Sequence, residues 1–463
     1  MKIAVIGAGI IGYQITHELA TKAPSSKVAL IGLNKSLNSP TYASGAMLNS
    51  ICEVDSYTLI SKYSKLLLQM CIDANHLWVD YSKNETHNFE TNQGTYCINT
   101  ANGDFLEDRN FNSITAACDT FGVEYNYVDP FTIPGLDPSN NCRTLRSIYI
   151  PNEGIVNIPT FMHSLVDKCD SLPNVSRYQS NVKKLSYSNN NICSIQTASG
   201  NKINPDLVII AAGVNSRELL YENAELYNLI QPIFYGIGST CELVVENLKQ
   251  KKCIRTPNKG GACGLYTLPR NSNSDPHNYL IGASNYVTTN PDSLPRLGSI
   301  THLLQMAEKE INRFFYKAHI SKINTGWRPI AKDGYPLLGQ LPTTNIFMAT
   351  GTKRLGVHLS PLISNLVSDC ILHNKVNPYL NSFSPTRSCI YDVDIETNIN
   401  QIVEQLMSEQ YQHGYRESGP LMNERLMNSY KDYAQKHFER LGITGHGLPI
   451  DTYKLYFKGL TSV

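Results

Sequence analysis

A glycine-rich turn at the start of the chain limits what this sequence can fold into. Residues 2–6 form a short apolar run rich in β-forming residues, and Gly7-Ala8-Gly9-Ile10-Ile11-Gly12 follows directly. Residues 13–22 then have the pattern of a helix, and residues 27–31 that of a second strand. A strand, a G-x-G-x-x-G turn, a helix and another strand within about 30 residues are typical of a dinucleotide-binding domain. The sequence therefore predicts an α/β fold of the Rossmann type.

Each glycine of this turn has a separate task. Gly7 permits the tight turn, Gly9 lets the backbone approach a pyrophosphate, and Gly12 lets the helix pack close to the strand. The N-terminus of the predicted helix offers free N–H groups and a positive dipole end to phosphate groups. The acidic residue that usually binds a ribose hydroxyl is missing, because Asn34 follows the second strand. We expect Asn34 to bind the ribose more weakly than a carboxylate would.

The composition excludes several classes of protein. The 463 residues are 41% hydrophobic and 17% charged, which is typical of a globular chain with a large core and two or three domains. A formal net charge of +1 argues against nucleic acid as a partner. No apolar run is long enough for a transmembrane helix and no signal peptide precedes the first strand, so we expect a cytoplasmic protein. The twelve cysteines form no C-x-x-C pair, which predicts reduced thiols and no metal site.

The rest of the chain alternates between strand-like and helix-like patterns. Residues 58–82 have helical periodicity, and residues 174–206 predict a β-meander. The apolar run at residues 207–213 is typical of a buried parallel strand, with a glycine where doubly wound sheets bind ligands. Further helices are predicted at residues 300–315 and 358–373. The nucleotide-binding domain is therefore expected to consist of separated segments, with a strand-rich domain inserted between them.

Five stretches of the chain carry more specific information. In order, they are Val5–Gly12, Ala43–Leu48, Val208–Gly213, Leu265–Arg270 and the segment from Gly326 to Gly356. Together they resemble the amino-acid oxidase family of flavoenzymes, and most closely its glycine oxidase and sarcosine oxidase-like branch. The first and third stretches are shared by many flavoproteins, whereas the order and spacing of the last two match that branch. The resemblance extends from the first residue to about residue 380.

The resemblance implies a bound FAD without a covalent link to the protein. No cysteine lies between residues 326 and 345, where sarcosine oxidase relatives carry such a link. The residues expected near the pyrophosphate, ribose and adenine are Gly7, Gly9, Ile11, Gly12, Asn34 and Val182. Those expected near the flavin are Ala43, Ser44, Gly45, Ala46, Met47, Leu48, Ala212, Gly213, Arg328, Gly351, Arg354, Leu355, Gly356 and Val357.

Three residues are expected to act on the substrate. Arg328 matches the arginine that binds the substrate carboxylate in this family, and a planar guanidinium can form two charge-assisted hydrogen bonds with a carboxylate. Tyr266 matches a tyrosine whose hydroxyl assists, and Arg354 matches an arginine nearby. For either arginine the alternative is a structural ion pair. Lys353 stands close to the place where the family often has a histidine, and is either solvated or near enough to the flavin to assist oxygen reduction by its charge.

The resemblance implies an enzyme that oxidises the C–N bond of a small amino acid or N-substituted glycine. Hydride passes to flavin N5, an imine forms, and oxygen reoxidises the flavin to give hydrogen peroxide. Three alternatives remain open: a dehydrogenase of the same fold that uses a quinone or carrier, a tailoring oxidase for a larger amino-acid-derived metabolite, and a non-catalytic subunit that binds a partner. The presence of Arg328 and Tyr266 weighs against the last.

The patterns divide the chain into three parts. The FAD-binding domain is expected to comprise residues 1–50, 145–215 and 325–380, and the substrate-binding domain residues 51–144 and 216–324. Residues 385–463 extend past the usual end of the family and predict amphipathic helices. We expect these helices to pack on the body, to close over the site, or to form the interface of a homo-oligomer.

Overall fold

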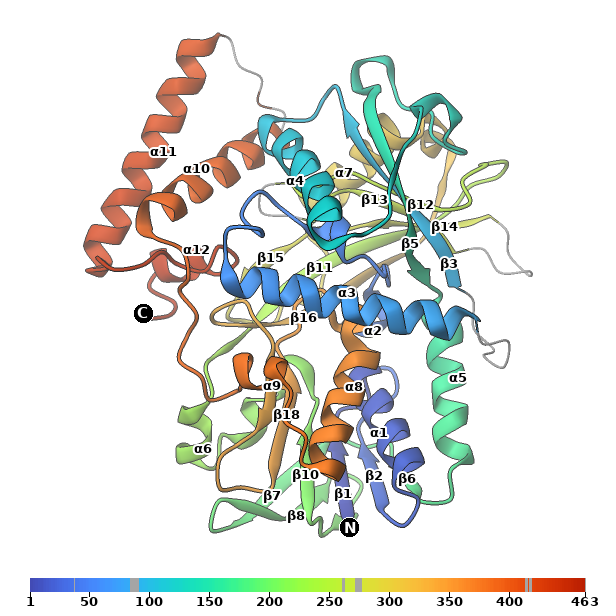
Figure 1. The fold of residues 1–463 in the computed structure, drawn as a ribbon, viewed down its shortest axis with the longest axis vertical. Coiled ribbons are helices and arrows are strands. Elements are labelled where there is room, and N and C mark those ends of the chain that lie inside the picture. Colours follow the sequence, from blue (N-terminus) through green and yellow to red (C-terminus); the bar gives the residue numbers. More distant parts are fainter. Residues whose placement is uncertain are drawn as a thin grey trace.

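Two large β-sheets dominate the computed structural model, one at the lower end and one at the upper end of the view in Figure 1. The structure describes residues 1–36, 38–83, 91–259, 263–270, 277–412, 415 and 419–462. The strand order of the lower sheet is β17 (Leu337–Gln340), β18 (Ile346–Thr350), β10 (Leu207–Ile210), β1 (Lys2–Ile6), β2 (Lys27–Ile31) and β6 (Val175–Tyr178).

The lower sheet is parallel except at one edge. β1 pairs in parallel with β10 and β2, and β18 continues the parallel order, whereas β17 is antiparallel to β18. Helices α1 (Ile10–Lys22), α5 (Ile158–Ser171) and α8 (Gly356–His373) pack together on one face. The other face is covered by α6 (Ala224–Leu229) and a small sheet of β7 (Val182–Ser188), β8 (Asn191–Thr197) and β9 (Lys202–Ile203). Burial on both faces explains the continuous apolar runs in these strands.

The upper sheet has nine strands and is mostly antiparallel. Its order is β15 (Tyr286–Thr288), β11 (Ile233–Val244), β14 (Asn278–Gly282), β13 (Tyr266–Pro269), β12 (Cys253–Arg255), β3 (Thr91–Thr100), β5 (Thr144–Val156) and β4 (Asn126–Tyr127), with β16 (His319–Ala331) also paired to β11. Helices α4 (Phe105–Phe121) and α7 (Leu297–Met306) belong to this half, and α3 (Lys62–Lys83) crosses between the two sheets (Figure 1).

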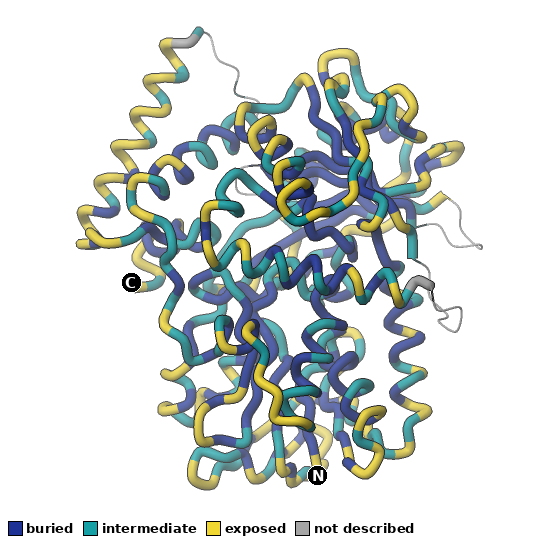
Figure 2. Tube along the Cα trace, viewed as in Figure 1, coloured by how far each residue is buried: buried dark blue, intermediate teal, exposed yellow. Residues whose placement is uncertain are grey.

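Most of the C-terminal segment forms its own helical unit beside the upper sheet (Figure 1). This unit contains α10 (Ile395–Gln412), α11 (Pro420–Leu441) and α12 (Tyr453–Phe457), whereas α9 (Pro378–Ser382) packs on the lower half beside β17. Apolar residues of α10, α11 and α12 share a separate hydrophobic cluster that includes Ile402, Phe438 and Tyr456. The outer side of α11 is exposed in Figure 2, with Leu421 70% exposed and Tyr433 46% exposed. The segment therefore packs on the body as one of the expected alternatives, and a homo-oligomer stays a prediction.

Most of the fold expected from the sequence is confirmed, and one helix is not as predicted. The single helix predicted over residues 300–315 ends early. α7 ends at Met306, and one π-helical turn over Ala307–Ile311 continues it as far as Asn312. Asn312 is extended, with φ −155°, and its side chain accepts a hydrogen bond from the backbone N–H of Phe314. This capping contact starts a separate short turn, which an apolar periodicity alone does not reveal.

The predicted division into domains stays a proposal. β5 and β16 both lie in the nine-stranded sheet, so the proposed boundaries at residues 145 and 325 cut through strands of that sheet. β16 is long enough to run from the upper sheet toward the lower one, and its residue Ile330 forms a β-bridge with Thr352, just after β18. This strand therefore links the two halves directly.

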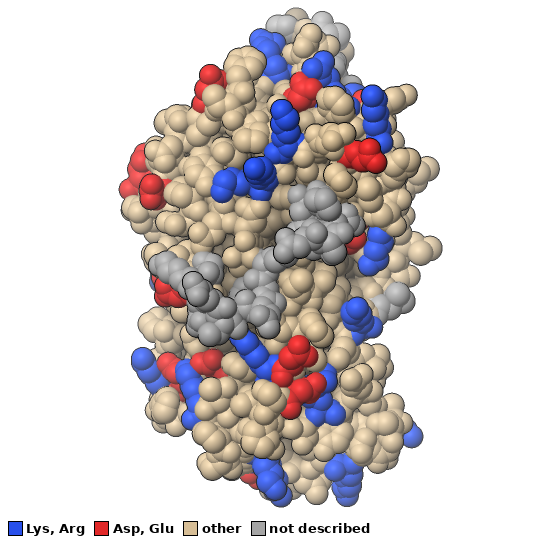
Figure 3. Space-filling view, turned by 90° about the vertical axis from the view of Figure 1, so that its right-hand side faces the viewer, with Lys and Arg blue, Asp and Glu red and all other residues tan. Residues whose placement is uncertain are grey.

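The hydropathy of the helices and the distribution of surface charge bear on possible partners. Of the helices in the described ranges, none combines the length and the apolar character that a membrane span requires. On the face shown in Figure 3, basic and acidic side chains are interspersed, and the described residues there form no continuous basic patch. This distribution agrees with the nearly balanced count of charged residues in the sequence.

Candidate functional site

A cavity of ≈ 460 Å³ lies between the two sheets. The lower sheet contributes the carboxyl ends of β1, β2, β10 and β18, and α8 contributes its first turn. The upper sheet contributes residues of β11, β13 and β16. Doubly wound sheets bind ligands at the carboxyl ends of their strands, and the volume is in the usual range for cofactor pockets.

The turn between β1 and α1 leaves room for a ligand at only one of its three glycines. Gly7 has φ +120°, and a Cβ there would lie 2.2 Å from the carbonyl oxygen of Ala211. A Cβ on Gly12 would lie 1.8 Å from the carbonyl oxygen of Gly7. At Gly9 the nearest atom would be Thr41 Oγ1, 3.4 Å away. Gly7 and Gly12 therefore fix the turn and the helix, while Gly9 leaves open space in front of α1.

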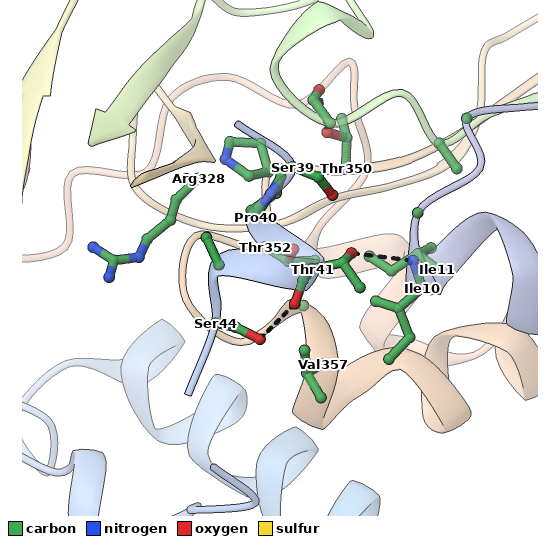
Figure 4. Close-up of a pocket in the computed structure, with 18 of the residues that line it drawn as sticks. Ile10, Ile11, Ser39, Pro40, Thr41, Ser44, Arg328, Thr350, Thr352 and Val357 are labelled. Carbon is green, nitrogen blue, oxygen red and sulfur yellow. Dashed lines mark hydrogen bonds between the residues drawn. The ribbon is translucent and has the colours of Figure 1, made fainter. Parts of the chain in front are cut away.

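A short helix, α2 (Pro40–Ala43), holds the neighbouring loop against this turn (Figure 4). The backbone N–H of Ile10 donates to Thr41 Oγ1 at 3.2 Å, and Ser44 Oγ donates to the carbonyl oxygen of Thr41 at 2.8 Å. Thr41 thus satisfies one free N–H of the first turn of α1. The N–H group of Ile11 has no partner within the helix and lines the cavity, and so can bind a phosphate oxygen.

Most of the cofactor residues predicted from the sequence line the cavity. They are Gly7, Gly9, Ile11, Ala43, Ser44, Gly45, Ala46, Met47, Val182, Ala212, Gly213, Arg328, Arg354, Leu355, Gly356 and Val357. The same wall contains Tyr266, and also Thr41, Ser180, Thr350 and Thr352, which the sequence analysis did not single out.

Four predicted residues do not line it, for different reasons. Gly12 is covered by the turn itself, and Gly351 lines a neighbouring cavity. Leu48 is 6% exposed and its N–H donates to the carbonyl oxygen of Gly154. Asn34 Oδ1 already accepts hydrogen bonds from Tyr13 at 2.5 Å and from Arg177 at 3.3 Å. The cavity wall near the end of β2 is formed instead by Gly32, Leu33 and Ser36.

Arg328 presents its guanidinium to the cavity from β16. The group lies directly over Gly238 of β11, where a Cβ would come within 2.2 Å of Arg328 Cζ. Arg328 Nη1 donates to the carbonyl oxygen of Ser284 at 3.1 Å and to Asn285 Oδ1 at 3.0 Å. The part of the chain that the structure describes gives this guanidinium neutral acceptors and no carboxylate. Its charge is therefore available to a ligand.

Arg354, in contrast, already has a carboxylate partner. Its Nε lies 3.0 Å from Glu53 Oε2, and its Nη1 donates to Cys263 Sγ at 2.9 Å. The same carboxylate lies 2.7 Å from Arg255 Nη1. Burial raises the pKa of Glu53, but the charges of Arg354 and Arg255 outweigh it and lower this pKa to about 2. Glu53 is therefore ionised at neutral pH and pairs with Arg354, one of the two arginines that line the cavity.

Tyr266 adds a hydroxyl group to the same wall. Its ring fits against Gly45 and Gly282, where a Cβ would lie 2.8 Å and 2.2 Å from ring or hydroxyl atoms. The side chain is 2% exposed, and this burial raises the pKa of Tyr266 well above its ordinary value although Arg328 acts in the opposite direction. The hydroxyl is therefore protonated at neutral pH, and among the described residues it has no hydrogen-bond partner.

Lys353 is held by the C-terminal segment. Its ammonium group forms an ion pair with Asp451, and its side chain is 19% exposed. Its backbone N–H donates to the carbonyl oxygen of Pro329 at 2.9 Å, next to Arg328. The alternative of a solvated lysine is therefore wrong, and a role in oxygen reduction stays a prediction.

The sequence analysis missed the two residues that determine the charge and the orientation of the arginines. Glu53 stands in an otherwise apolar stretch, Ile51-Cys52-Glu53-Val54, and a lone carboxylate in such a stretch is a sign of a buried ion pair. Asn285 lies directly before β15 and gave no comparable signal. Both contacts join residues that are far apart in the chain.

The comparisons with known proteins agree with this geometry. A family model described as FAD dependent oxidoreductase matches residues 2–370. The chain belongs to this family. The members of the FAD dependent oxidoreductase family bind FAD, and the resemblance seen in the sequence is confirmed. The match ends before α9, so the helical C-terminal segment lies outside it.

Two curated relatives are similar to this FAD dependent oxidoreductase over only part of their own length. A bifunctional protein ThiO/ThiG of Synechocystis sp. is 44% identical over 62 residues, which are 13% of this chain and 10% of that protein. A D-amino acid dehydrogenase of Methylobacterium radiotolerans is 21% identical over 264 residues, 56% of this chain and 59% of that protein. The chain thus spans between a tenth and three fifths of these curated relatives.

A solved structure supports the same fold. The glycine oxidase of Geobacillus kaustophilus is similar with a TM-score of 0.69 and 21% identity, over 83% of this chain and 98% of that chain. The cavity of this FAD dependent oxidoreductase fits the cofactor, because the open space at Gly9 and the first turn of α1 suit a pyrophosphate. The first turn of α8, at Gly356 and Val357, presents N–H groups and a positive dipole end to the same cavity.

The open space at Gly9 predicts that Gly9→Val abolishes FAD binding without unfolding the protein. The new side chain would fill the approach to the pyrophosphate, yet no protein atom lies within 3.4 Å of its Cβ. We expect a folded and colourless protein, measured by flavin absorbance and by circular dichroism. Gly7→Val is the matched control and should not fold, since its Cβ meets backbone at 2.2 Å. A Gly9→Val protein that carries a full load of FAD would contradict this site.

The ion pairs of Glu53 predict a large loss of stability in Glu53→Gln. The variant leaves the charges of Arg255 and Arg354 buried without a counter-charge, which should lower the free energy of unfolding by about 3–5 kcal/mol. The control is Glu409→Gln, which breaks the partly exposed pair with Lys454 and should cost less than about 1 kcal/mol. Thermal unfolding measures both, and equal melting temperatures for the two variants would show that the Glu53 pairs do not matter.

Proposed function

We propose that the protein oxidises the C–N bond of a small amino acid or of an N-substituted glycine. The observation that carries this proposal is Arg328, a cation in the FAD cavity whose partners among the described residues are all neutral. A cation held in this way attracts an anionic group of the substrate, and a carboxylate matches the fork of the guanidinium in shape and charge.

The neighbours of Arg328 fix its orientation toward such a substrate. Ser284 and Asn285 occupy Nη1 alone, so the hydrogen-bond donors on Nε and Nη2 remain for two carboxylate oxygens. Gly238 behind the guanidinium has no side chain, which leaves the space that the guanidinium occupies. Because the group is already positioned, little side-chain entropy is lost when the substrate binds.

Glu53 and Tyr266 complete the proposed substrate site. Glu53 pairs with Arg354, so this arginine, unlike Arg328, already has a carboxylate partner within the protein. The protonated hydroxyl of Tyr266 can donate a hydrogen bond to the substrate, and its burial excludes water from the reacting carbon. FAD, when bound, supplies the acceptor for the hydride. Binding, orientation and the exclusion of water are then the work of the protein.

A second candidate is a dehydrogenase that passes electrons to a quinone or a protein carrier. The similarity to a D-amino acid dehydrogenase over 56% of this chain favours it. Both candidates use the same substrate site and differ only in the electron acceptor. Admission of air after the flavin has been bleached anaerobically separates them, because rapid return of the colour with formation of hydrogen peroxide indicates an oxidase.

The role of Arg328 predicts a loss of selectivity for the carboxylate. Each charge-assisted hydrogen bond contributes roughly 1.5–3 kcal/mol, so Arg328→Ala should lower kcat/KM for an amino acid by about 10²–10⁴-fold. Arg328→Lys should restore only part of the activity, because an ammonium group cannot form two parallel bonds. The measurement is kcat/KM for the amino acid and for the matching amine that lacks the carboxylate. If the wild type prefers the amine, or Arg328→Ala keeps the preference for the acid, the proposal is wrong.

A further inference from the structure

A second cavity of ≈ 390 Å³ adjoins the cavity that contains Arg328. Lys353 and Arg354 line both cavities. Asn285, which accepts a hydrogen bond from Arg328, lines the second one. A substrate whose carboxylate binds Arg328 therefore has this second cavity next to it.

The C-terminal helical segment forms one wall of this second cavity. Gln401, Gln405 and residues between 450 and 460 line it, opposite β15, α4 and residues 55–57. The wall is fixed to the body, since Asp451 pairs with Lys353 and Glu404 accepts a hydrogen bond from Tyr57 at 2.9 Å. The family match ends at residue 370, so this wall is an addition of this chain to the family fold.

The polar groups of this wall favour an uncharged ligand. Its buried charges are already paired, as in Lys353 with Asp451 and Lys259 with Glu310 at 3.0 Å. The uncharged polar side chains of the lining are Tyr57, Asn285, Thr288, Gln401 and Gln405, of which Tyr57 already donates to Glu404 and Asn285 accepts from Arg328. Amide and hydroxyl side chains exchange hydrogen bonds with hydroxyl or amide groups of a ligand, which an alkyl group cannot do.

Gln401 is the most informative of these side chains. It is 7% exposed on α10, and it lines both the second cavity and the cavity that contains Gly351. Its Oε1 accepts a hydrogen bond from Asn398 at 3.3 Å, while its amide nitrogen has no partner in the part of the chain that the structure describes. This nitrogen can therefore donate a hydrogen bond to an acceptor atom of a ligand.

We propose that the substrate carries, beyond its amino-acid head, an uncharged hydrogen-bonding substituent that occupies this second cavity. An oxygen atom of the substituent accepts a hydrogen bond from the amide nitrogen of Gln401. The substrate class is thus an amino acid or N-substituted glycine with a hydroxyl- or amide-bearing group on its nitrogen or α-carbon. This inference rests on the proposed function, because it assumes that the carboxylate binds Arg328.

The test compares two series of N-substituted glycines of increasing chain length on the holoenzyme. One series carries N-hydroxyalkyl groups and the other N-alkyl groups of equal length. A second pair of series carries the same hydroxyalkyl and alkyl groups on the α-carbon of the amino acid. We expect one chain length at which the hydroxylated compound has a kcat/KM about 3- to 10-fold higher than its alkyl partner, mostly through a lower KM. Gln401→Leu should abolish that preference, and Gln401→Met serves if the first variant does not fold.

The control is Gln410→Leu, on the same helix and outside both cavities, which should keep the preference. If small substrates such as sarcosine reduce the flavin but no hydroxylated compound is preferred at any length, the second cavity is not a substrate site. Retention of the preference in Gln401→Leu would equally overturn the role of Gln401. If no compound reduces the flavin, sarcosine and glycine included, the proposed function itself fails and the inference with it.

Discussion

A buried chain of charges, Arg255–Glu53–Arg354, determines the character of the cavity between the two sheets. Arg255 lies on β12 of the upper sheet, and Arg354 precedes α8 of the lower half. Glu53 ends a short 3₁₀ turn that follows the loop at residues 43–48. Removing three charges from water is expensive, and the cost is offset only while both pairs are kept. The network therefore fixes three segments relative to each other and gives Arg354 a carboxylate partner within the protein.

Arg328 lies outside this network. Whereas Arg354 is paired with Glu53, Arg328 is the arginine whose charge faces the cavity with only neutral partners in the described structure. Its position depends on both halves of the molecule, because β16 pairs with β11 in the upper sheet and bridges to Thr352 beside the lower one. Because the strand is held at both ends, the position of the guanidinium is well defined, as the binding of a reacting group requires.

The sequence predicted those features that depend on neighbouring residues. The turn at Gly7, Gly9 and Gly12 follows from backbone geometry within six positions, and the structure shows the expected close contacts. The pairing of Arg354 could not be predicted, because it depends on Glu53, about 300 positions earlier. Asn34 was expected to bind ribose, and only the fold reveals that Tyr13 and Arg177 occupy its acceptor. Amphipathic periodicity likewise indicated C-terminal helices but not the cavity that they enclose.

The central claim is that Arg328, and not Arg354, binds the carboxylate of the substrate. A crystal structure of the FAD-loaded protein with methoxyacetate tests it most directly, since this compound has the size of an N-methylated glycine and an ether oxygen in place of the amine. The account predicts both carboxylate oxygens on the guanidinium of Arg328, with Arg354 still paired to Glu53. A carboxylate bound to Arg354 with Glu53 displaced, or bound away from both arginines, would contradict it.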